Sequence, residues 1–240
     1  MNPTIKTLLS HRSIRKFTSE TIPNDWLDAI IQSGIQASSS SFMQVTSIIR
    51  VNDPEKRVQL ATLAGNQKYV QEAAEFLVFC IDYDRHKSIN ANVDTENAEL
   101  TLIGAVDAGI MAQNCMIAAE SLGLGGVYIG GIRNNAQSVH DLLSIPKNCS
   151  VLFGLCLGFP SQDPSIKPRL KQKVIVHQDQ YQPMSQQDID DYDHELKQYY
   201  QQRSTNKKVS NWSTDIPNKL TKESRPHMME YLHNNNLNKK

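Results

Sequence analysis

The sequence lacks the marks of a secreted, metal-stapled or membrane-spanning protein. It has four cysteines in 240 residues, without a CxxC pair or zinc-ligand spacing, which favours a reducing compartment. No apolar run approaches the roughly 18 to 20 residues that span a bilayer, because the most apolar stretch, residues 100–122, contains Asp107 and Glu120. Residues 1–17 carry charges throughout and lack a signal-peptide core. We therefore expect a soluble, cytoplasmic protein with no membrane partner.

The sequence also has no excess of either charge, since 25 Lys and Arg residues balance 25 Asp and Glu residues. We expect no nucleic-acid partner, and any anion site must be a local cluster. The P-loop, HExxH and GxSxG motifs are absent, and the glycine run at 123–126 joins a predicted helix to a strand, the wrong order for a dinucleotide fold. P-loop NTPases, zinc proteases, the usual serine hydrolases and a Rossmann site are thus disfavoured, and we expect no metal site.

Hydrophobic periodicity predicts alternating helices and strands. Helices are predicted over residues 4–10, 23–36, 54–63, 94–122, 139–143 and 186–200, and strands over 45–51, 76–81, 127–129 and 151–158. Beyond Pro160 the chain is more polar and is punctuated by prolines. We predict a single domain over residues 1–240, in which 161–240 form a less tightly packed C-terminal extension.

The helix predicted over 94–122 is unusually slim, because glycines and alanines occupy many of its positions. Its larger apolar residues form one stripe at helical spacing, namely Ile103, Val106, Ile110 and Ile117. Small residues let another helix approach closely. The helix is therefore either a buried core helix within one subunit or the seam of a dimer, and the sequence favours neither.

Two basic clusters have the chemistry to bind an anion. Residues 11–15, His-Arg-Ser-Ile-Arg, offer an imidazole, two guanidinium groups and a hydroxyl, which together make a good phosphate clamp. A solvated basic turn fits this short cluster equally well. Residues 167–169, Lys-Pro-Arg, form a second compact cation pair, which by itself is typical of an exposed loop.

Three further segments can be interpreted either as parts of a ligand site or as ordinary loops and turns. Ser38 to Ser41 with Phe42 supply hydroxyls and an aromatic face, although a flexible loop is the commoner meaning of such a run. Residues 128–131, Tyr-Ile-Gly-Gly, allow a flat ring to approach the main chain, or simply form a tight turn. Arg203 with Lys207 and Lys208 can receive a nucleotide phosphate, or form a solvated loop.

Taken together, these segments resemble the nitroreductase superfamily, in the branch that contains flavin reductase P and the major oxygen-insensitive nitroreductase. The likeness covers the whole chain and is closest to flavin reductase P. It depends on an ordered set of motifs at residues 11–15, 38–41, 65–69, 73–76, 118–131, 155–158, 167–170 and 223–226.

The resemblance implies an α+β fold with a central, mainly antiparallel sheet flanked by helices. It also implies a homodimer with the long helix at its seam and one non-covalent FMN in each site. The residues it assigns to the cofactor are His11, Arg12, Ser13, Ile14, Arg15, Ser39, Gln67, Tyr69, Tyr128, Ile129, Gly130, Gly131, Lys167, Pro168 and Arg169. Those it assigns to NADPH are Arg203 and Lys208.

The implied reaction is a ping-pong transfer of hydride from NADPH to bound FMN and on to free flavin, nitroaromatics or quinones. No catalytic side chain is implied, although Arg15 stabilises the reduced flavin. One alternative makes nitroaromatic or quinone reduction the main task. An alternative of another class is a flavin carrier that hands reduced FMN to an acceptor enzyme.

Overall fold

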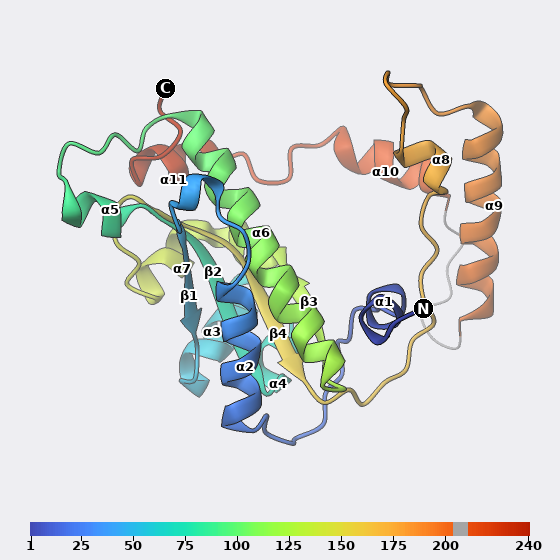
Figure 1. Cartoon of the computed structure of the whole chain (residues 1–240), viewed down its shortest axis with the longest axis horizontal. Coiled ribbons are helices and arrows are strands. Elements are labelled where there is room, and N and C mark those ends of the chain that lie inside the picture. Colours follow the sequence, from blue (N-terminus) through green and yellow to red (C-terminus); the bar gives the residue numbers. More distant parts are fainter. Residues whose placement is uncertain (204–210) are drawn as a thin grey trace. The chain divides into compact units, whose positions relative to one another are not determined.

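The computed structural model describes residues 1–203 and 211–240 and divides into two compact units (Figure 1). The first contains Met1–Asp163 together with Arg225–Lys240, and the second contains Pro164–Ser224. Residues 225–240, which the polar composition groups with the C-terminal extension, bury Tyr231 and Leu237 in the first unit. The α+β class and the antiparallel sheet predicted above are confirmed.

The first unit is built on a four-stranded antiparallel sheet in the order β1-β2-β4-β3. The strands are β1 (Thr46–Arg50), β2 (Glu75–Asp82), β3 (Gly125–Ile129) and β4 (Cys149–Gly158). The two central strands read as continuous apolar runs because both of their faces are covered. Along β2, Leu77 and Phe79 enter one core, whereas Phe76 and Val78 enter the core on the opposite face.

Helices cover both faces of this sheet. On one face α6 (Ala98–Ser121) packs beside α2 (Asn24–Ile35), as Figure 1 shows. Side chains of α3 (Pro54–Leu63), α7 (Ala136–Leu142) and α11 (Met228–Asn234) join the core on the other face. The remaining elements of this unit are α1 (Pro3–Leu9), α4 (Tyr69–Glu72), α5 (Asp84–Ile89) and the 3-10 helices η1 (Ser40–Phe42) and η2 (Gly130–Asn135).

The long helix α6 turns many of its small residues toward the core, together with Met116. Ala108 and Ala112 are fully buried, and a Cβ on Gly34 of α2 would lie 2.4 Å from the Cys115 sulfur, so the two helices pack in close contact. Val106 and Ile110 of the predicted stripe are instead 58% and 40% exposed. The single chain therefore leaves an apolar face of α6 uncovered.

The length and mean hydropathy of α6 are sufficient for a helix that crosses a membrane. No such helix was expected from the sequence, because polar residues interrupt this stretch. Its packing against α2 and the sheet is nevertheless that of a core helix. Asp107, near its centre, is 5% exposed and accepts hydrogen bonds from Ser39 and Ser40. These contacts satisfy a carboxylate that a lipid-facing helix would leave unpaired.

The second unit contains α8 (Gln172–Ile175), α9 (Gln186–Gln202) and α10 (Trp212–Leu220). Helix α9 begins at the N-cap Ser185, whose hydroxyl accepts a hydrogen bond from the Asp188 amide. Its buried side chains, Tyr192, Leu196 and Tyr200, recur every fourth residue and form one face. The helices α4, α5, α8, α10 and α11 were not predicted, because four of them have seven residues or fewer and α10 contains Pro217.

A buried histidine fixes α11 onto α7. His140 Nδ1 lies 3.3 Å from the Tyr231 hydroxyl, which also accepts a 2.9 Å hydrogen bond from the Val151 amide. Burial lowers the pKa of His140 below its ordinary value; Lys147 acts in the same direction, while Asp141 opposes the shift. The folded protein therefore holds this imidazole neutral where the unfolded chain binds a proton.

We expect the free energy of unfolding to fall as the pH drops through about 6.5, the ordinary histidine value, toward the lower folded pKa of His140. Below 6.5 the unfolded state binds more protons than the native state, so acid favours unfolding. His140→Gln should flatten this part of the pH profile. Urea unfolding of both proteins at about pH 7.5, 6.5 and 5.5 measures it, and identical profiles would contradict the assignment.

Candidate functional site

The basic segment 11–15 is held against the start of β3. The Ile14 amide donates a 2.9 Å hydrogen bond to the Gly126 carbonyl, and the Ile14 side chain is 4% exposed. A Cβ on Gly125 would lie 2.4 Å from that side chain, so this position requires glycine. Further along, Phe17 pairs with Pro160 just beyond β4. The segment is therefore fixed in the fold rather than a solvated turn.

Two basic side chains of this segment have acidic partners distant in sequence. His11 Nδ1 lies 2.6 Å from Glu120 Oε1 at the end of α6. Arg12 donates from Nη2 to Asp163 Oδ1 at 2.5 Å and from Nη1 to the Ser10 carbonyl at 3.3 Å. Its Nε is buried and has no partner in the described part of the chain. One donor of Arg12 is thus left unsatisfied.

Ser13 and Arg15 alternate with the inward-facing Ile14. Ser13 is half-buried and Arg15 is exposed. Neither side chain makes a hydrogen bond or ion pair with another residue that the structure describes. Both are therefore available to a ligand beside β3. Next to them, a cavity of about 190 Å³ is lined by Arg12, Ile14, Glu120, Gly125 and Pro160, among others.

At the far end of β3, Gln67 and Tyr69 lie against a glycine. Tyr69 donates to Gln67 Oε1 at 2.7 Å, and Gln67 Nε2 donates to the Ala64 carbonyl at 2.8 Å. A Cβ on Gly131 would lie 2.5 Å from both that carbonyl and Gln67 Nε2. The sequence separates these residues by more than sixty positions, yet the fold brings them together as one polar edge.

The neighbouring turn carries two arginines. Arg225 donates from Nη2 to the Gly130 carbonyl at 3.2 Å and from Nε to Asn134 Oδ1 at 3.1 Å. Arg133 donates to the Leu152 carbonyl, and burial, together with the positive charge of Arg225, lowers the pKa of Arg133. No role was predicted for Arg133 or Arg225. The motif at 223–226 was the only sequence signal that pointed to Arg225.

Tyr128, the exposed residue of β3, lies over the sheet. Its hydroxyl donates to Gln113 Oε1 of α6 at 3.1 Å, and its ring meets the Phe153 ring edge to face. Burial of the hydroxyl raises its pKa. The next residue, Ile129, is 1% exposed and belongs to the core. Only the main chain of Ile129 is therefore available to a ligand.

Ser39 lies in a separate loop, where its hydroxyl is already bonded. It donates to Asp107 Oδ2 at 2.7 Å and accepts from the Gln44 amide at 2.7 Å. The loop is strained, since Ser41 and Phe42 have φ of 47° and 58°. Phe42 is 80% exposed. Ser39 and Asp107 line a cavity of about 390 Å³ between α2, β1 and α6.

The predicted residues beyond position 163 belong to the second unit. Arg169 Nη1 donates to the Lys167 carbonyl at 2.7 Å, and Tyr192 of α9 donates to the Pro168 carbonyl at 3.1 Å. Arg203 is the C-cap of α9 and lies over two tyrosine rings. Lys208, together with Lys207, lies outside the described residues.

The arrangement along β3 fits a ligand with an anion at one end and a flat, polar-edged ring at the other. Segment 11–15 meets the strand at Gly126, and Gln67 meets the chain at Gly131, just beyond Ile129, where the strand ends roughly 10 Å further on at the usual strand rise per residue. Arg12 keeps a donor without a partner, and Gly130 leaves the main chain open. An FMN molecule, with its phosphate and isoalloxazine ring, has this chemistry.

The described residues hold no sign of a metal or a cysteine nucleophile. His, Cys, Asp and Glu form no group of three or more that could hold a metal ion in the described part of the chain. All four cysteines are free and buried, and burial raises the pKa of Cys115 to about 11. The fold is that of an α+β protein, and the described residues along β3 have the chemistry to hold an anion and a flat ring.

Comparison with known proteins identifies the family. The Nitroreductase family model matches residues 8–159, and that of the Nitroreductase family, C-terminal domain, matches residues 167–240. The chain is 58% identical over 240 residues to the NADPH-flavin oxidoreductase of Vibrio harveyi, with 100% of both chains covered. It is 50% identical over 233 residues to the oxygen-insensitive NADPH nitroreductase of Salmonella typhimurium, with 97% of both covered. This chain belongs to the nitroreductase family.

Solved structures agree over the whole length. Nitroreductase A from Vibrio parahaemolyticus matches with a TM-score of 0.96 at 58% identity, and 100% of both chains is covered. The NADPH:FMN oxidoreductase from Vibrio harveyi complexed with NAD+ matches with a TM-score of 0.95 at 56% identity, again over 100% of both. The predicted nitroreductase-like fold is therefore confirmed.

Proposed function

We propose that this chain is an NADPH-dependent FMN oxidoreductase that reduces free flavin and also accepts nitroaromatics and quinones. The observation that carries the proposal is full-length identity of 58% to an NADPH-flavin oxidoreductase. The clusters at both ends of β3 support it, because they supply the groups that a flavin nucleotide needs. Its small-molecule substrates are thus a reduced nicotinamide and an aromatic acceptor.

The residues have separable roles in this proposal. His11, Arg12 and Ser13 bind the phosphate and ribityl end, as the unsatisfied Arg12 Nε favours. Lys167 and Arg169 contribute further positive charge to the phosphate. Gln67, positioned by Tyr69 and Ala64, presents its amide to the pyrimidine edge of the ring.

Bound FMN supplies the chemistry of the reaction by accepting a hydride equivalent and passing it on. Arg15 holds a permanent positive charge, without an acidic partner among the described residues, where negative charge develops on reduction. The open main chain at Gly130 lets a flat ring approach closely. These residues bind, orient and stabilise charge, which explains why no acid–base triad is needed.

The homodimer is part of the proposal and rests on α6. Leu102, Val106 and Ile110 are 62%, 58% and 40% exposed, and a Cβ on Gly109 would meet nothing within 4 Å. An uncovered apolar helix face of this kind is typical of a subunit interface. A second copy on this face explains the exposed stripe. The free cysteines suit the cytoplasm, where we place the enzyme.

Nitroaromatic or quinone reduction as the main task is the second candidate. It is favoured by 50% identity to an oxygen-insensitive NADPH nitroreductase, only slightly below that to the flavin oxidoreductase. Side-by-side kcat/KM values for FMN and nitrofurazone decide between them. A large preference for the nitro compound would reverse our order.

The visible spectrum of the purified protein tests the proposed function. We expect a yellow protein whose flavin bands bleach anaerobically on one equivalent of NADPH, and much more slowly with NADH. A colourless protein that fails to bind added FMN would overturn the cofactor, the clamp and the reaction together. A yellow protein that bleaches equally fast with both nucleotides would retain FMN and remove the NADPH preference.

A further inference from the structure

One tyrosine ring in the second unit contacts two cations that the family resemblance assigns to different ligands, Lys167 to FMN and Arg203 to NADPH. Lys167 Nζ lies 5.7 Å from the centroid of the Tyr200 ring, and the Arg203 guanidinium carbon lies 5.7 Å from the same centroid. Tyr200 is 8% exposed, on the buried face of α9. The ring therefore has a fixed place from which it can position both side chains.

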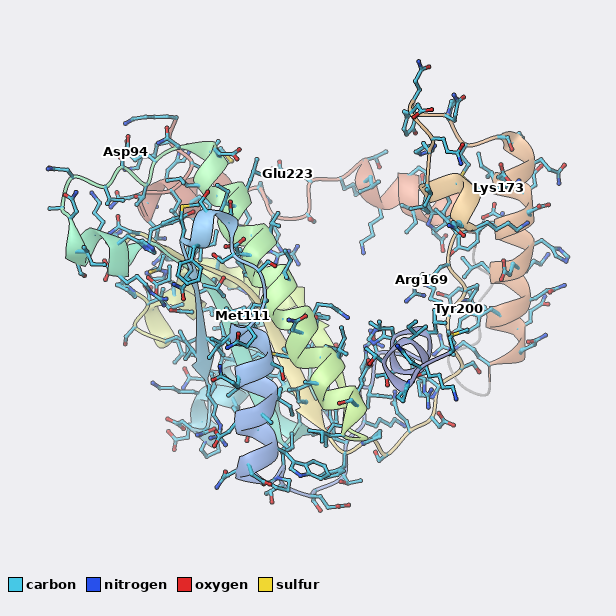
Figure 2. The ribbon with its side chains drawn as sticks, viewed as in Figure 1. Asp94, Met111, Arg169, Lys173, Tyr200 and Glu223 are labelled. Carbon is cyan, nitrogen blue, oxygen red and sulfur yellow. The ribbon has the colours of Figure 1, made fainter. Side chains whose placement is uncertain are left out.

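Helix α9 also holds the segment that carries Lys167. Tyr192 donates to the Pro168 carbonyl at 3.1 Å, and Tyr199 donates to the Ser165 carbonyl at 3.4 Å. In Figure 2 Arg169 and Tyr200 lie toward the C-terminal end of this helix, whereas Lys173 lies toward its N-terminal end. Arg203 is the C-cap itself. Two separate parts of the sequence thus place cations at one helix end.

An aromatic ring is better suited than a carboxylate to position a cation that must itself bind an anion. Neither Lys167 nor Arg203 makes an ion pair with a carboxylate among the described residues, so each keeps its full charge for an incoming anion. The ring face attracts a cation and restricts its rotamers without neutralising it. Arg12, by contrast, is already paired with Asp163. The contact therefore orders the side chains and leaves their anion affinity intact.

We propose that Tyr200 is a positioning residue that holds Lys167 toward the FMN phosphate and Arg203 toward the 2′-phosphate of NADPH. This inference rests on the proposed function, since that function requires FMN and NADPH, the two ligands that carry these phosphates. The Tyr200 ring then contributes both to the affinity for FMN and to the preference for NADPH over NADH. Tyr199 differs, because its ring contacts Arg203, at 5.9 Å, as its single cation among those described.

The test replaces Tyr200 with leucine in the full-length holoenzyme. We expect the Kd for FMN, measured from flavin fluorescence released on dilution, to rise roughly three- to tenfold. The Kd for NADP+, measured by fluorescence titration, should rise by a similar factor while that for NAD+ stays within about twofold. Tyr200→Phe keeps the ring and should restore both affinities. Tyr199→Leu should weaken NADP+ binding, because it removes a ring that contacts Arg203.

Leu196→Ala is the matched control for a merely structural effect. Leu196 is 3% exposed on the same face of α9, and its aliphatic side chain offers no ring to a cation. This variant should lower the Tm while leaving both Kd values within about twofold. The inference is overturned if it changes FMN and NADP+ binding as much as Tyr200→Leu does, or if Tyr200→Phe behaves like Tyr200→Leu. A wild-type protein that binds no FMN would instead refute the proposed function.

Discussion

Replacing Arg203 by alanine is expected to raise the KM for NADPH by about ten- to a hundredfold and the KM for NADH by no more than about twofold. Arg203 is proposed to bind the 2′-phosphate, a group that NADH lacks. A hydrogen bond to a charged group contributes about 1.5 to 3 kcal/mol, which corresponds to this range of binding constants. Stopped-flow reduction of the bound flavin by each nucleotide measures the two effects separately.

The control for this prediction is Arg203→Lys, which keeps the charge and loses the planar fork. Because guanidinium binds phosphate through two parallel hydrogen bonds, lysine should recover only part of the lost affinity. The maximal rate of flavin reduction at saturating NADPH should stay unchanged in both variants, since the lost contact is equal in ground and transition states. Equal changes in the KM for NADPH and NADH would remove Arg203 from this role.

The sequence predicted the core strands and the long helix because their signals are local. An uninterrupted apolar run such as 76–81 is what a strand with two covered faces requires, and β2 is such a strand. The sequence left open which face of α6 meets the core, because that choice is not local. Gly104 and Ala108 face the core here, whereas Val106 faces outward. Only the close helix packing, a tertiary property, decides this.

The contacts within the candidate site also could not be predicted from local sequence signals. The resemblance supplied its residues, but their partners are distant: Glu120 lies 109 positions from His11, and Asp163 lies 151 positions from Arg12. Arg225 meets Gly130 across 95 positions. No spacing rule connects such pairs. Composition and periodicity therefore described the elements, whereas the acidic partners of the basic segment required the folded chain.

Those acidic partners sharpen the second large prediction. Arg12→Ala should release FMN, raising its Kd at least about tenfold, because the guanidinium is proposed to donate charge-assisted hydrogen bonds to the phosphate. The ratio of flavin to protein after gel filtration measures retention, and the fluorescence of released FMN gives the Kd. The segment should remain in place without Arg12, since the Ile14 amide and the buried Ile14 side chain hold it. A fully yellow variant would contradict the phosphate assignment.

Asp163→Asn keeps the Arg12 guanidinium and removes the negative charge of its acidic partner. The Asp163 side chain is 83% exposed, and an ion pair of this kind contributes at most about 1 kcal/mol, so a phosphate carrying nearly two negative charges should displace it. Removing the carboxylate's charge removes a competitor, and FMN should bind as tightly as in the wild type or up to about threefold more tightly. If Asp163→Asn instead loses FMN, the Arg12–Asp163 pair is a structural support of the segment rather than a resting state that the phosphate replaces.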